Sequence, residues 1–263
     1  MPREWLDVSQ FSFNSLLLLE RVQISWLPGW LPENDLQIAL RANPAVEWYL
    51  RHKCPQISEW LDQTMSISQE TGPDCSARIR QAEASVLTSM TDLLIYAIDP
   101  AVYDAQPFLN WDPNELLSLT DFNGKTVIDV GAGTGKLSLL VAEMANSVFA
   151  VEPVANLRLY LKTKARARRF KNIYTMDGLI ADIPLPDRFA DISMAGHVFG
   201  DDLEMEYTEL ARVTRPGGML ILCPGNNDID NNTHKFLIEN NFEWSRFEEP
   251  RDGIKRKYWK TIV

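Results

Sequence analysis

The sequence predicts an α/β fold, in which a mostly parallel sheet with an antiparallel C-terminal strand follows a helical N-terminal domain. From Lys125 onward, short apolar segments alternate with helical segments, which is typical of a parallel sheet covered by helices. A glycine-rich turn joins the first apolar segment to the first helix. Near the C-terminus, Asp252-Gly253 separates two strand-like segments, and this dipeptide is typical of a hairpin between antiparallel strands.

The elements of this α/β half follow from the spacing of apolar residues and from the turn residues between them. We expect strands over residues 126–130, 147–151, 172–175, 191–195, 219–222, 242–248 and 254–262. We expect helices over residues 136–145, 154–170, 203–213 and 232–240.

The first half of the chain has helical spacing and no clear strand alternation. Apolar residues recur at this spacing over 35–50, with an interruption at Asn43-Pro44. The clearest amphipathic helix is expected over 77–98. Asp99-Pro100 ends it, because proline cannot continue the hydrogen-bond ladder.

We therefore predict two domains, a helical one over 1–120 and an α/β one over 121–263. Turn residues between 66 and 76 indicate a linker inside the helical part. Several tryptophans lie within the first 60 residues: Trp5, Trp26, Trp30, Trp48 and Trp60. We expect them to serve core and interface packing; the alternative is the wall of a substrate pocket.

The net charge of −10 is unevenly distributed. Residues 1–120 carry 7 basic and 16 acidic side chains, whereas the remaining residues carry 19 and 20. An acidic chain repels phosphate backbones at long range, so a nucleic-acid substrate is disfavoured.

The cysteines and the apolar segments indicate the cellular compartment in which the protein is expected to reside. Cys54, Cys75 and Cys223 are far apart and lack CxxC spacing, so we expect no disulfide framework or zinc site, as in a reducing cytosol. The N-terminus is too acidic for a signal peptide, and no apolar run reaches the ~20 residues that cross a bilayer. We predict a cytoplasmic protein without membrane segments.

The segment VIDVGAGTGKLSLLVAE (127–143) is an apolar strand, three alternate glycines and an amphipathic helix. Glycines permit a sharp turn and a ligand close to the backbone, and the helix directs free N–H groups at that ligand. The triphosphate pattern G-x-x-x-x-G-K-[ST] fails, because Val130 and Leu137 occupy two required positions. The dinucleotide pattern G-x-G-x-x-G fails at Lys136, so a nicotinamide cofactor is the alternative.

An acid follows this loop at the end of the next strand. Glu152 lies 17 residues after Gly135. A carboxylate at a strand end accepts hydrogen bonds from both hydroxyls of a ribose, so the loop and the acid together indicate a cofactor that contains a ribose.

Four segments of this half resemble the class I S-adenosylmethionine-dependent methyltransferases, in particular their small-molecule group. The segments are VIDVGAGTGKLS (127–138), AVEP (150–153), ADIPLPDRFADISMAGHVFGD (181–201) and ELARVTRPGGMLIL (209–222). The resemblance spans most of 124–263 and none of 1–120. It implies a Rossmann-like fold and S-adenosyl-L-methionine as the cofactor. No cluster of carboxylates and histidines in the sequence indicates a metal site.

The resemblance implies a role for each matching segment. The loop would approach the methionine and ribose parts of the cofactor; it consists of Gly131, Ala132, Gly133, Thr134 and Gly135. Asp129 would bond near the methionine amino group through water. Glu152 would hold the ribose hydroxyls, and Pro153 would pack near the adenine.

The resemblance also places the adenine. Asp177 would accept a hydrogen bond from the adenine amino group, with the backbone of Gly178 and Leu179 at the ring edge. The spacing from Asp177 to the next proline differs from the usual family spacing, so Asp182 stays open as the alternative.

The end of the fourth strand would face the reacting methyl group. Ala195 and Gly196 would approach the methionine end of the cofactor with their carbonyls. His197, just past this strand, is the candidate catalytic base. Asp201 and Asp202 are expected to cap the following helix.

We predict methyl transfer to a small-molecule acceptor by in-line displacement, in which a base is needed only when the nucleophile carries a proton. Residues 1–120 would form a lid and an acceptor pocket, to which Tyr103 and Phe108 contribute. Three alternatives remain: an RNA methyltransferase using the basic segment 158–171, a nicotinamide oxidoreductase, and a binding protein without activity. The acceptor, the attacking atom and the oligomeric state, a homodimer included, stay open.

Overall fold

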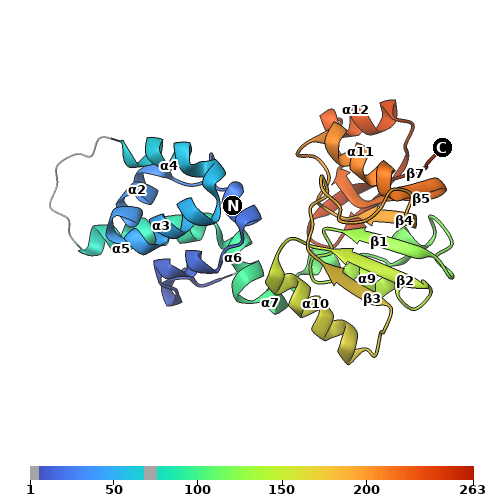
Figure 1. Cartoon of the computed structure of the whole chain (residues 1–263), viewed down its shortest axis with the longest axis horizontal. Coiled ribbons are helices and arrows are strands. Elements are labelled where there is room, and N and C mark those ends of the chain that lie inside the picture. The colour runs from blue at the N-terminus through green and yellow to red at the C-terminus, as the bar shows by residue number, and fades with distance from the viewer. Residues whose placement is uncertain (1–5, 68–75) are drawn as a thin grey trace. The chain divides into compact units, whose positions relative to one another are not determined.

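The computed structural model describes residues 6–67 and 76–263 (Figure 1). The chain divides into two compact units, Met1–Tyr103 and Asp104–Val263, and each is described by itself. Residues 68–75 of the predicted linker lie outside the described residues.

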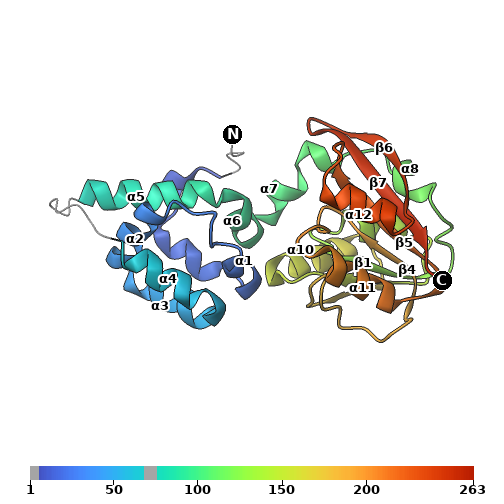
Figure 2. The same ribbon diagram turned by 90° about the horizontal axis from the view of Figure 1, so that it is seen from above.

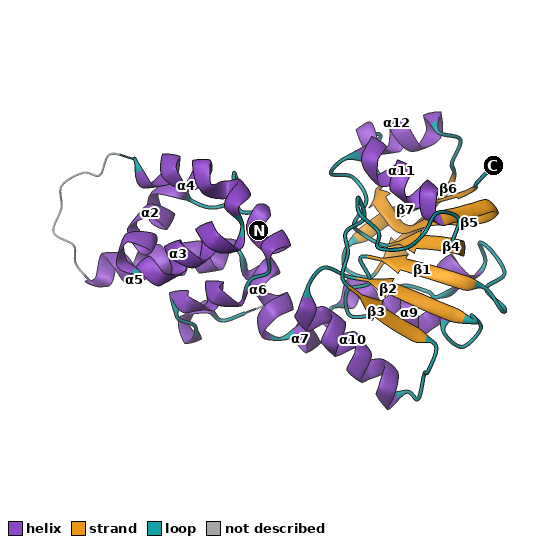
Figure 3. Ribbon diagram, in the orientation of Figure 1, coloured by secondary structure: helices purple, strands orange, loops and turns teal. Residues whose placement is uncertain are grey.

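The described part of unit 1 is helical (Figure 3). Its elements are η1 (Val8–Gln10), η2 (Phe13–Leu18), α1 (Arg21–Ser25), α2 (Glu33–Ala42), α3 (Pro44–Lys53), η3 (Pro55–Ile57), α4 (Ser58–Met65), α5 (Ser76–Ser89), α6 (Thr91–Ile98) and α7 (Pro100–Asp104), whose last residue opens unit 2. Buried aliphatic side chains from these elements form one core, including Leu16, Leu36, Leu50, Leu61 and Val86.

The predicted interruption between α2 and α3 is confirmed. Asn43 has the non-helical angles φ −127° and ψ 67°, and Pro44 begins α3. The Asn43 side chain donates a hydrogen bond to the Ala39 carbonyl at 2.9 Å, which satisfies a carbonyl in the last turn of α2. Proline is favoured at a helix start because its missing N–H would have no partner there.

The single helix predicted over 77–98 is wrong, because it breaks at Met90 into α5 and α6. Met90 is fully buried and has the angles φ −123° and ψ 20°. Its carbonyl accepts hydrogen bonds from Leu93 and Leu94 at 3.0 and 2.9 Å and so begins α6. Burial of Met90 in the unit 1 core accompanies the break, and local apolar spacing contains no signal for it.

Three tryptophans of this unit lie outside its core, and one packs against it as expected. Trp26, Trp30 and Trp48 are exposed, at 39%, 46% and 59%. Trp60 packs against the core and donates a hydrogen bond to Glu33 at 2.8 Å. Trp5 lies outside the described residues.

Unit 2 contains a seven-stranded sheet of order β3-β2-β1-β4-β5-β7-β6 (Figures 1 and 2). Its strands are β1 (Thr126–Val130), β2 (Ser147–Val151), β3 (Ile173–Met176), β4 (Ala190–Ala195), β5 (Thr214–Asn227), β6 (Glu243–Glu249) and β7 (Gly253–Thr261). The pairs among β1 to β5 are parallel, whereas β7 pairs antiparallel with both β5 and β6. The predicted mostly parallel sheet with an antiparallel C-terminal strand is confirmed.

Helices cover both faces of this sheet (Figure 3). They are η4 (Pro107–Leu109), α8 (Asn114–Leu117), α9 (Lys136–Val141), α10 (Ala155–Ala167), α11 (Leu203–Val213) and α12 (Asn232–Glu239). Alternate strand residues face opposite layers: Val127 packs in a cluster with α8 and α9, and Ile128 in a cluster with α11 and α12. The carboxyl ends of the parallel strands therefore meet at one edge, where an open α/β sheet binds ligands.

The structural division falls at Tyr103–Asp104, whereas the sequence-based domain boundary is at residue 120. Trp111, Leu116 and Phe122 are buried in one cluster with strands of the sheet. Residues 104–120 therefore pack as part of unit 2, because their large apolar side chains cover one face of its sheet.

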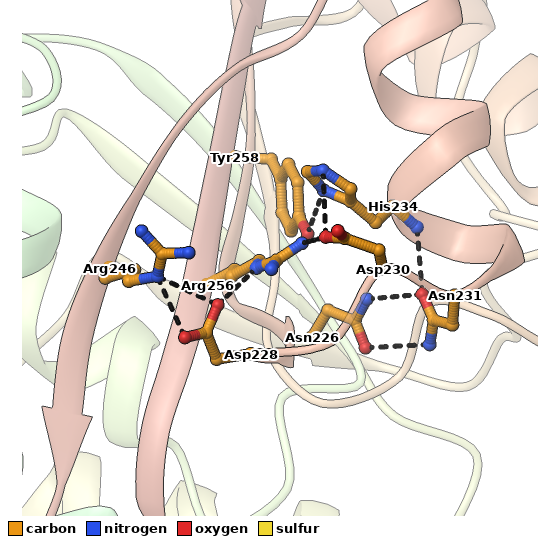
Figure 4. A network of polar contacts seen from close by, with 8 residues as sticks. All are labelled: Asn226, Asp228, Asp230, Asn231, His234, Arg246, Arg256 and Tyr258. Carbon is orange, nitrogen blue, oxygen red and sulfur yellow. Dashed lines mark hydrogen bonds and ion pairs between the residues drawn. The ribbon is translucent and has the colours of Figure 1, made fainter.

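A polar network holds the segment after β5 against the β6–β7 hairpin (Figure 4). Asp228 accepts hydrogen bonds from Arg246 and Arg256, and Asp230 accepts one from Arg256 at 2.8 Å. Both guanidinium groups also lie over the ring of Trp244, at 5.1 and 4.7 Å from its centroid. The network fixes the chain where it leaves the carboxyl end of β5.

Candidate cofactor and methyl-transfer site

The turn between β1 and α9 forms the first part of the candidate site. Gly131, Gly133 and Gly135 have φ angles of 68°, 53° and 87°, a region that favours glycine. The N–H groups of Gly131 and Ala132 donate to the Val151 carbonyl at 2.8 and 3.1 Å. The backbone itself thus requires the alternate glycines, and it ties the turn to the end of β2.

The space beside two of these glycines is filled by side chains. A Cβ at Gly131 would meet the side chain of Val198, and a Cβ at Gly135 would meet Leu161 of α10. The carbonyl of the buried Thr134 accepts a hydrogen bond from Lys164 Nζ at 3.1 Å. Helix α10 therefore packs directly against the turn and holds its shape.

Asp129 lies buried beneath the turn. Its Oδ2 accepts hydrogen bonds from the Ser138 N–H and hydroxyl at 2.8 and 2.5 Å, whereas its Oδ1 has no hydrogen-bond partner. Burial raises the pKa of Asp129 to about 6, although the Ser138 hydrogen bonds oppose this shift. An unpartnered buried carboxylate oxygen is costly, so it fits a site that receives a donor from a ligand or a water molecule.

Glu152 follows β2 at the same edge and is 5% exposed. Its Oε2 accepts from the Gly133 N–H and its Oε1 from the Val154 N–H, both at 2.9 Å. Burial raises the pKa of Glu152 to about 7, against the lowering effect of these hydrogen bonds. Each oxygen keeps a further lone pair for a ligand hydroxyl, and the next residue, Pro153, is half-buried.

Arg158 of α10 joins Glu152 to Asp177. Its Nη1 donates to the Glu152 carbonyl at 2.5 Å and to Asp177 Oδ1 at 2.8 Å. The side chain of Asp177 is 75% exposed, so one of its oxygens is open to a ligand. The structure thus brings Asp177 to the Glu152 end of the site.

The turn after β3 carries the other predicted adenine contacts. Leu179 and Asp182 form a bridge in which each N–H donates to the other carbonyl, at 3.2 and 3.1 Å. A Cβ at Gly178 would crowd Pro184 and Val151, so glycine is needed for this close packing. Asp182 shares this turn with Asp177, and its backbone hydrogen bonds are with Leu179.

The residues after β4 form a second part of the edge. Ala195 is buried, and a Cβ at Gly196 would lie 3.1 Å from the Cys223 carbonyl oxygen. His197 has φ 61°, an uncommon region for a non-glycine residue, and its N–H donates to the Pro224 carbonyl at 2.9 Å. Strained backbone of this kind clusters at functional sites.

The His197 ring lies between an aromatic residue and an acid. The Phe108 ring meets it edge-on at 5.8 Å between centroids. On the other side Nε2 lies 2.8 Å from Oε1 of Glu249, the last residue of β6. The Glu249 side chain is fully buried, yet neither of its oxygens has a partner with hydrogen-bond geometry. Tyr103, the other predicted acceptor contact, ends unit 1 and meets Tyr96 edge-on.

The sequence analysis missed Glu249. It lies in the segment RFEEPRDG, which has the turn and charge composition of an exposed hairpin tip. Lys255 of β7 lies 3.7 Å from Glu249 Oε2, and it also contacts Asp252 at 2.8 Å and Asn227 Oδ1 at 2.6 Å. Only the pairing of β6 with β7, and the approach of this hairpin to His197, shows that the acid is buried.

The expected cap of the helix after β4 is confirmed at Asp202 and not at Asp201. The Asp202 side chain accepts a hydrogen bond from the Met205 N–H at 3.1 Å and caps α11, whereas Asp201 contributes its N–H to Glu206. Cys223 is fully buried, and burial raises the pKa of its thiol to about 12. It is therefore a structural cysteine and not a nucleophile.

Some cations of the basic segment 158–171 contact the candidate site, and the others are exposed to solvent. Arg158 and Lys164 contact the site, and Lys164 also pairs with Asp104 at 2.6 Å. The other cations are exposed: Lys162, Arg166, Arg168, Arg169 and Lys171. This is the arrangement of a solvated helix face.

The described part of the chain offers neither a metal-ion cluster nor a helix suited to a membrane. Within 6–67 and 76–263, no three or more His, Cys, Asp or Glu side chains gather as they would around a metal ion. No helix in these ranges is both long and apolar enough to cross a membrane.

Sequence comparisons match the α/β half. Residues 128–222 match the family described as methyltransferase domain. A malonyl-[acyl-carrier protein] O-methyltransferase of Serratia marcescens is 35% identical over 123 residues, which are 45% of this chain and 46% of that protein. A demethylmenaquinone methyltransferase of Tropheryma whipplei is 31% identical over 102 residues, 38% of this chain and 41% of that protein. The chain thus spans less than half the length of these relatives.

One solved structure has the same fold over its whole length. It is a SAM-dependent methyltransferase from Aquifex aeolicus with a TM-score of 0.50 and 21% sequence identity. The likeness covers 63% of this chain and 100% of that chain. It agrees with the Rossmann-like fold of unit 2.

Proposed function

Because residues 128–222 form a class I S-adenosylmethionine-dependent methyltransferase domain, we propose that the chain methylates a small-molecule acceptor by in-line displacement. The cofactor of this class is S-adenosyl-L-methionine. Two relatives support a small acceptor, since their names specify malonyl-[acyl-carrier protein] and demethylmenaquinone. The net charge of −10 also disfavours a nucleic-acid acceptor.

The residues at the carboxyl edge of the sheet fit this cofactor. Asp129 has an unpartnered buried oxygen for the amino group of the methionine part, reached through water. Glu152 would accept the ribose hydroxyls with its remaining lone pairs, next to Pro153. Asp177 would accept the adenine amino group, with Arg158 holding its other side.

Three backbone segments would complete the cofactor site. The glycine turn at 131–135 would approach the ribose and methionine parts with its backbone, whose positive φ angles depend on its three glycines. The Gly178–Leu179 backbone would meet the adenine ring edge. Ala195 and Gly196 would approach the methionine end of the cofactor with their backbone carbonyls.

The bound cofactor supplies an electrophilic methyl group on its sulfonium, so this chain has to position a nucleophile and exclude water. We propose His197 as the base for an acceptor whose attacking atom carries a proton. The lone pair of that atom forms the new bond to the methyl carbon, and the proton moves to the imidazole. The electron pair of the broken S–C bond stays on sulfur.

The buried Glu152 beside the glycine turn is the observation that carries the proposal. Isothermal titration with S-adenosylhomocysteine tests it, and NAD(H) and NADP(H) serve as comparison ligands for the oxidoreductase alternative. We expect binding of S-adenosylhomocysteine alone. Tight binding of a nicotinamide nucleotide with none of S-adenosylhomocysteine would contradict the proposal.

We also propose that the helical N-terminal half, predicted over 1–120, acts on the acceptor and not on the cofactor. The family match begins at residue 128, and unit 1 has a core of its own. A fragment of residues 104–263 is expected to bind S-adenosylhomocysteine like the full chain. The full chain is expected to methylate acceptors that the fragment does not. Equal turnover by both would remove the proposed role.

The RNA methyltransferase alternative rests on the exposed cations of the basic segment 158–171. It requires methyl transfer to RNA that falls steeply with salt, because counterions are released at each phosphate contact. Replacing Arg166 and Lys171 by Ala together would then lower the RNA signal. Our proposal expects no methyl transfer to RNA from radiolabelled cofactor at any salt concentration.

A further inference from the structure

The fully buried carboxylate of Glu249 has no role in the cofactor site described above. It ends β6, far along the chain from His197, yet its Oε1 lies 2.8 Å from His197 Nε2. Neither carboxylate oxygen has a partner with hydrogen-bond geometry among the described residues. A buried carboxylate without a bonded donor is costly to retain, so a donor that can align with it is expected to do so.

The charges around Glu249 indicate which donor that is. Lys255 is the nearest cation, 3.7 Å from Oε2, but its Nζ lies 2.8 Å from Asp252 Oδ2 and 2.6 Å from Asn227 Oδ1. One lysine therefore faces two carboxylates. A positive charge on His197 would make this group of side chains neutral overall, which lowers the cost of burying Glu249.

The backbone of His197 keeps the ring at this place. His197 holds the left-handed angle φ 61°, and its N–H donates to the Pro224 carbonyl at 2.9 Å. The Phe108 ring contacts the imidazole edge-on. These contacts leave Nδ1 without a hydrogen-bond partner among the described residues, on a ring that is 36% exposed.

We propose that Glu249 is a positioning residue that holds the Nε2–H of His197 and so presents Nδ1 as the proton acceptor during methyl transfer. The inference rests on the proposed function. When the acceptor loses its proton to Nδ1, the imidazole becomes positive, and the nearby Glu249 carboxylate stabilises it. The same arrangement of acid, imidazole and reacting proton operates in other proton-transfer sites.

Nuclear magnetic resonance of ¹⁵N-histidine-labelled full chain tests the Glu249 contact without an acceptor. The chain has three histidines, so a His197→Gln variant assigns the ring signals of His197 by their loss. We expect a downfield, exchange-protected Nε2–H signal from His197. Glu249→Leu, which keeps the buried volume, should abolish that signal, whereas Glu249→Gln, which keeps an acceptor oxygen, should retain it.

The other histidines serve as internal controls, because neither contacts Glu249. His52 bonds through Nδ1 to the Trp48 carbonyl, and His234 contacts Tyr258. Their signals should be unchanged in both Glu249 variants, and circular dichroism should show that both variants fold. If Glu249→Leu does not fold, the wild-type and Glu249→Gln spectra still test the inference, because both should contain the protected Nε2–H signal of His197.

Absence of a protected Nε2–H signal from His197 in the wild type, or its persistence in folded Glu249→Leu, would overturn the inference. Titration of the same samples with S-adenosylhomocysteine separates this outcome from failure of the proposed function. A protected signal in a protein that binds no S-adenosylhomocysteine would retain the Glu249 contact and refute the methyltransferase proposal. Binding of S-adenosylhomocysteine without the protected signal would retain the methyltransferase proposal and refute the Glu249 contact.

Discussion

Two corners of the same sheet edge are built in different ways. The glycine-loop corner consists of Asp129, the turn 131–135 and Glu152, all within two consecutive strands and their loops. The histidine corner consists of His197 and Glu249, which come from the ends of β4 and β6. The first corner is stabilised mostly by backbone hydrogen bonds inside one βαβ segment. The second depends on the long-range approach of a hairpin.

The difference shows why the glycine-loop corner can be predicted from the sequence and the histidine corner cannot. Positive φ angles require glycine at fixed positions, so the glycine-loop corner leaves a pattern of residue types. A buried acid that meets a histidine from a distant strand requires no neighbouring residue type. The histidine corner therefore appears only when the sheet is assembled.

The largest expected effect is on the backbone of the glycine-loop corner. Gly135→Ala should lower the free energy of unfolding by about 2–5 kcal/mol, from left-handed strain and from overpacking against Leu161. Gly124→Ala is the matched control, because Gly124 has φ 69° but open space beside it. It should cost only the strain, about 1–2 kcal/mol. Chemical denaturation measures both, and equal losses would show that Leu161 packing is unimportant.

The next effect concerns the ribose contact. Glu152→Ala should weaken binding of S-adenosylhomocysteine by about 1.5–3 kcal/mol, the range for hydrogen bonds to a charged group. Glu143→Ala, which removes an exposed acid after α9, should leave the affinity unchanged. Calorimetry measures both. An unaltered dissociation constant for Glu152→Ala would break the assignment of this corner.

The pH dependence of binding sharpens the role of Glu152. Its pKa of about 7 in the free protein means that the ionised form, which accepts the ribose hydroxyls, is the minority below pH 7. Affinity for S-adenosylhomocysteine should therefore fall about tenfold from pH 8 to pH 6. Glu152→Gln should flatten this slope, leaving the smaller change below about pH 6 that comes from Asp129. If Glu152→Gln keeps the wild-type pH dependence of affinity, that pH dependence comes from another titratable group.

The same two carboxyls affect the stability of the free protein in the opposite direction. Their folded-state pKa values lie above the ordinary values of 4.5 and 3.8, so the folded chain binds more protons than the unfolded chain in this range. Stability from these groups is thus present at low pH and is lost as the pH rises from about 4 to 7. Thermal melts of wild type and Glu152→Gln should converge at the acid end of that range.

The smallest expected effect is at the adenine end. Arg158→Ala removes a contact to the exposed Asp177, and exposed ion pairs contribute about 0.2–1 kcal/mol, so affinity should fall no more than about fivefold. Arg166→Ala, an exposed cation on the same helix, is the control. A loss from Arg158→Ala as large as that from Glu152→Ala would make Arg158 a principal cofactor contact.

The sequence by itself determined the α/β fold, the succession of strands and helices along its second half, and the glycine-loop corner. These follow from apolar periodicity, from turn residues and from the backbone angles that only glycine adopts readily. The strands predicted at 126–130 and 147–151 match β1 and β2 residue for residue. The cap at Asp202 was likewise predictable, because its cause lies within one helical turn.

Only the tertiary structure decided the break at Met90, the association of residues 104–120 with unit 2 and the pairing of His197 with Glu249. In each case the cause is a contact between segments distant in the chain. Burial in a shared core or beside a distant charge depends on how the elements pack, and local residue spacing does not encode that packing.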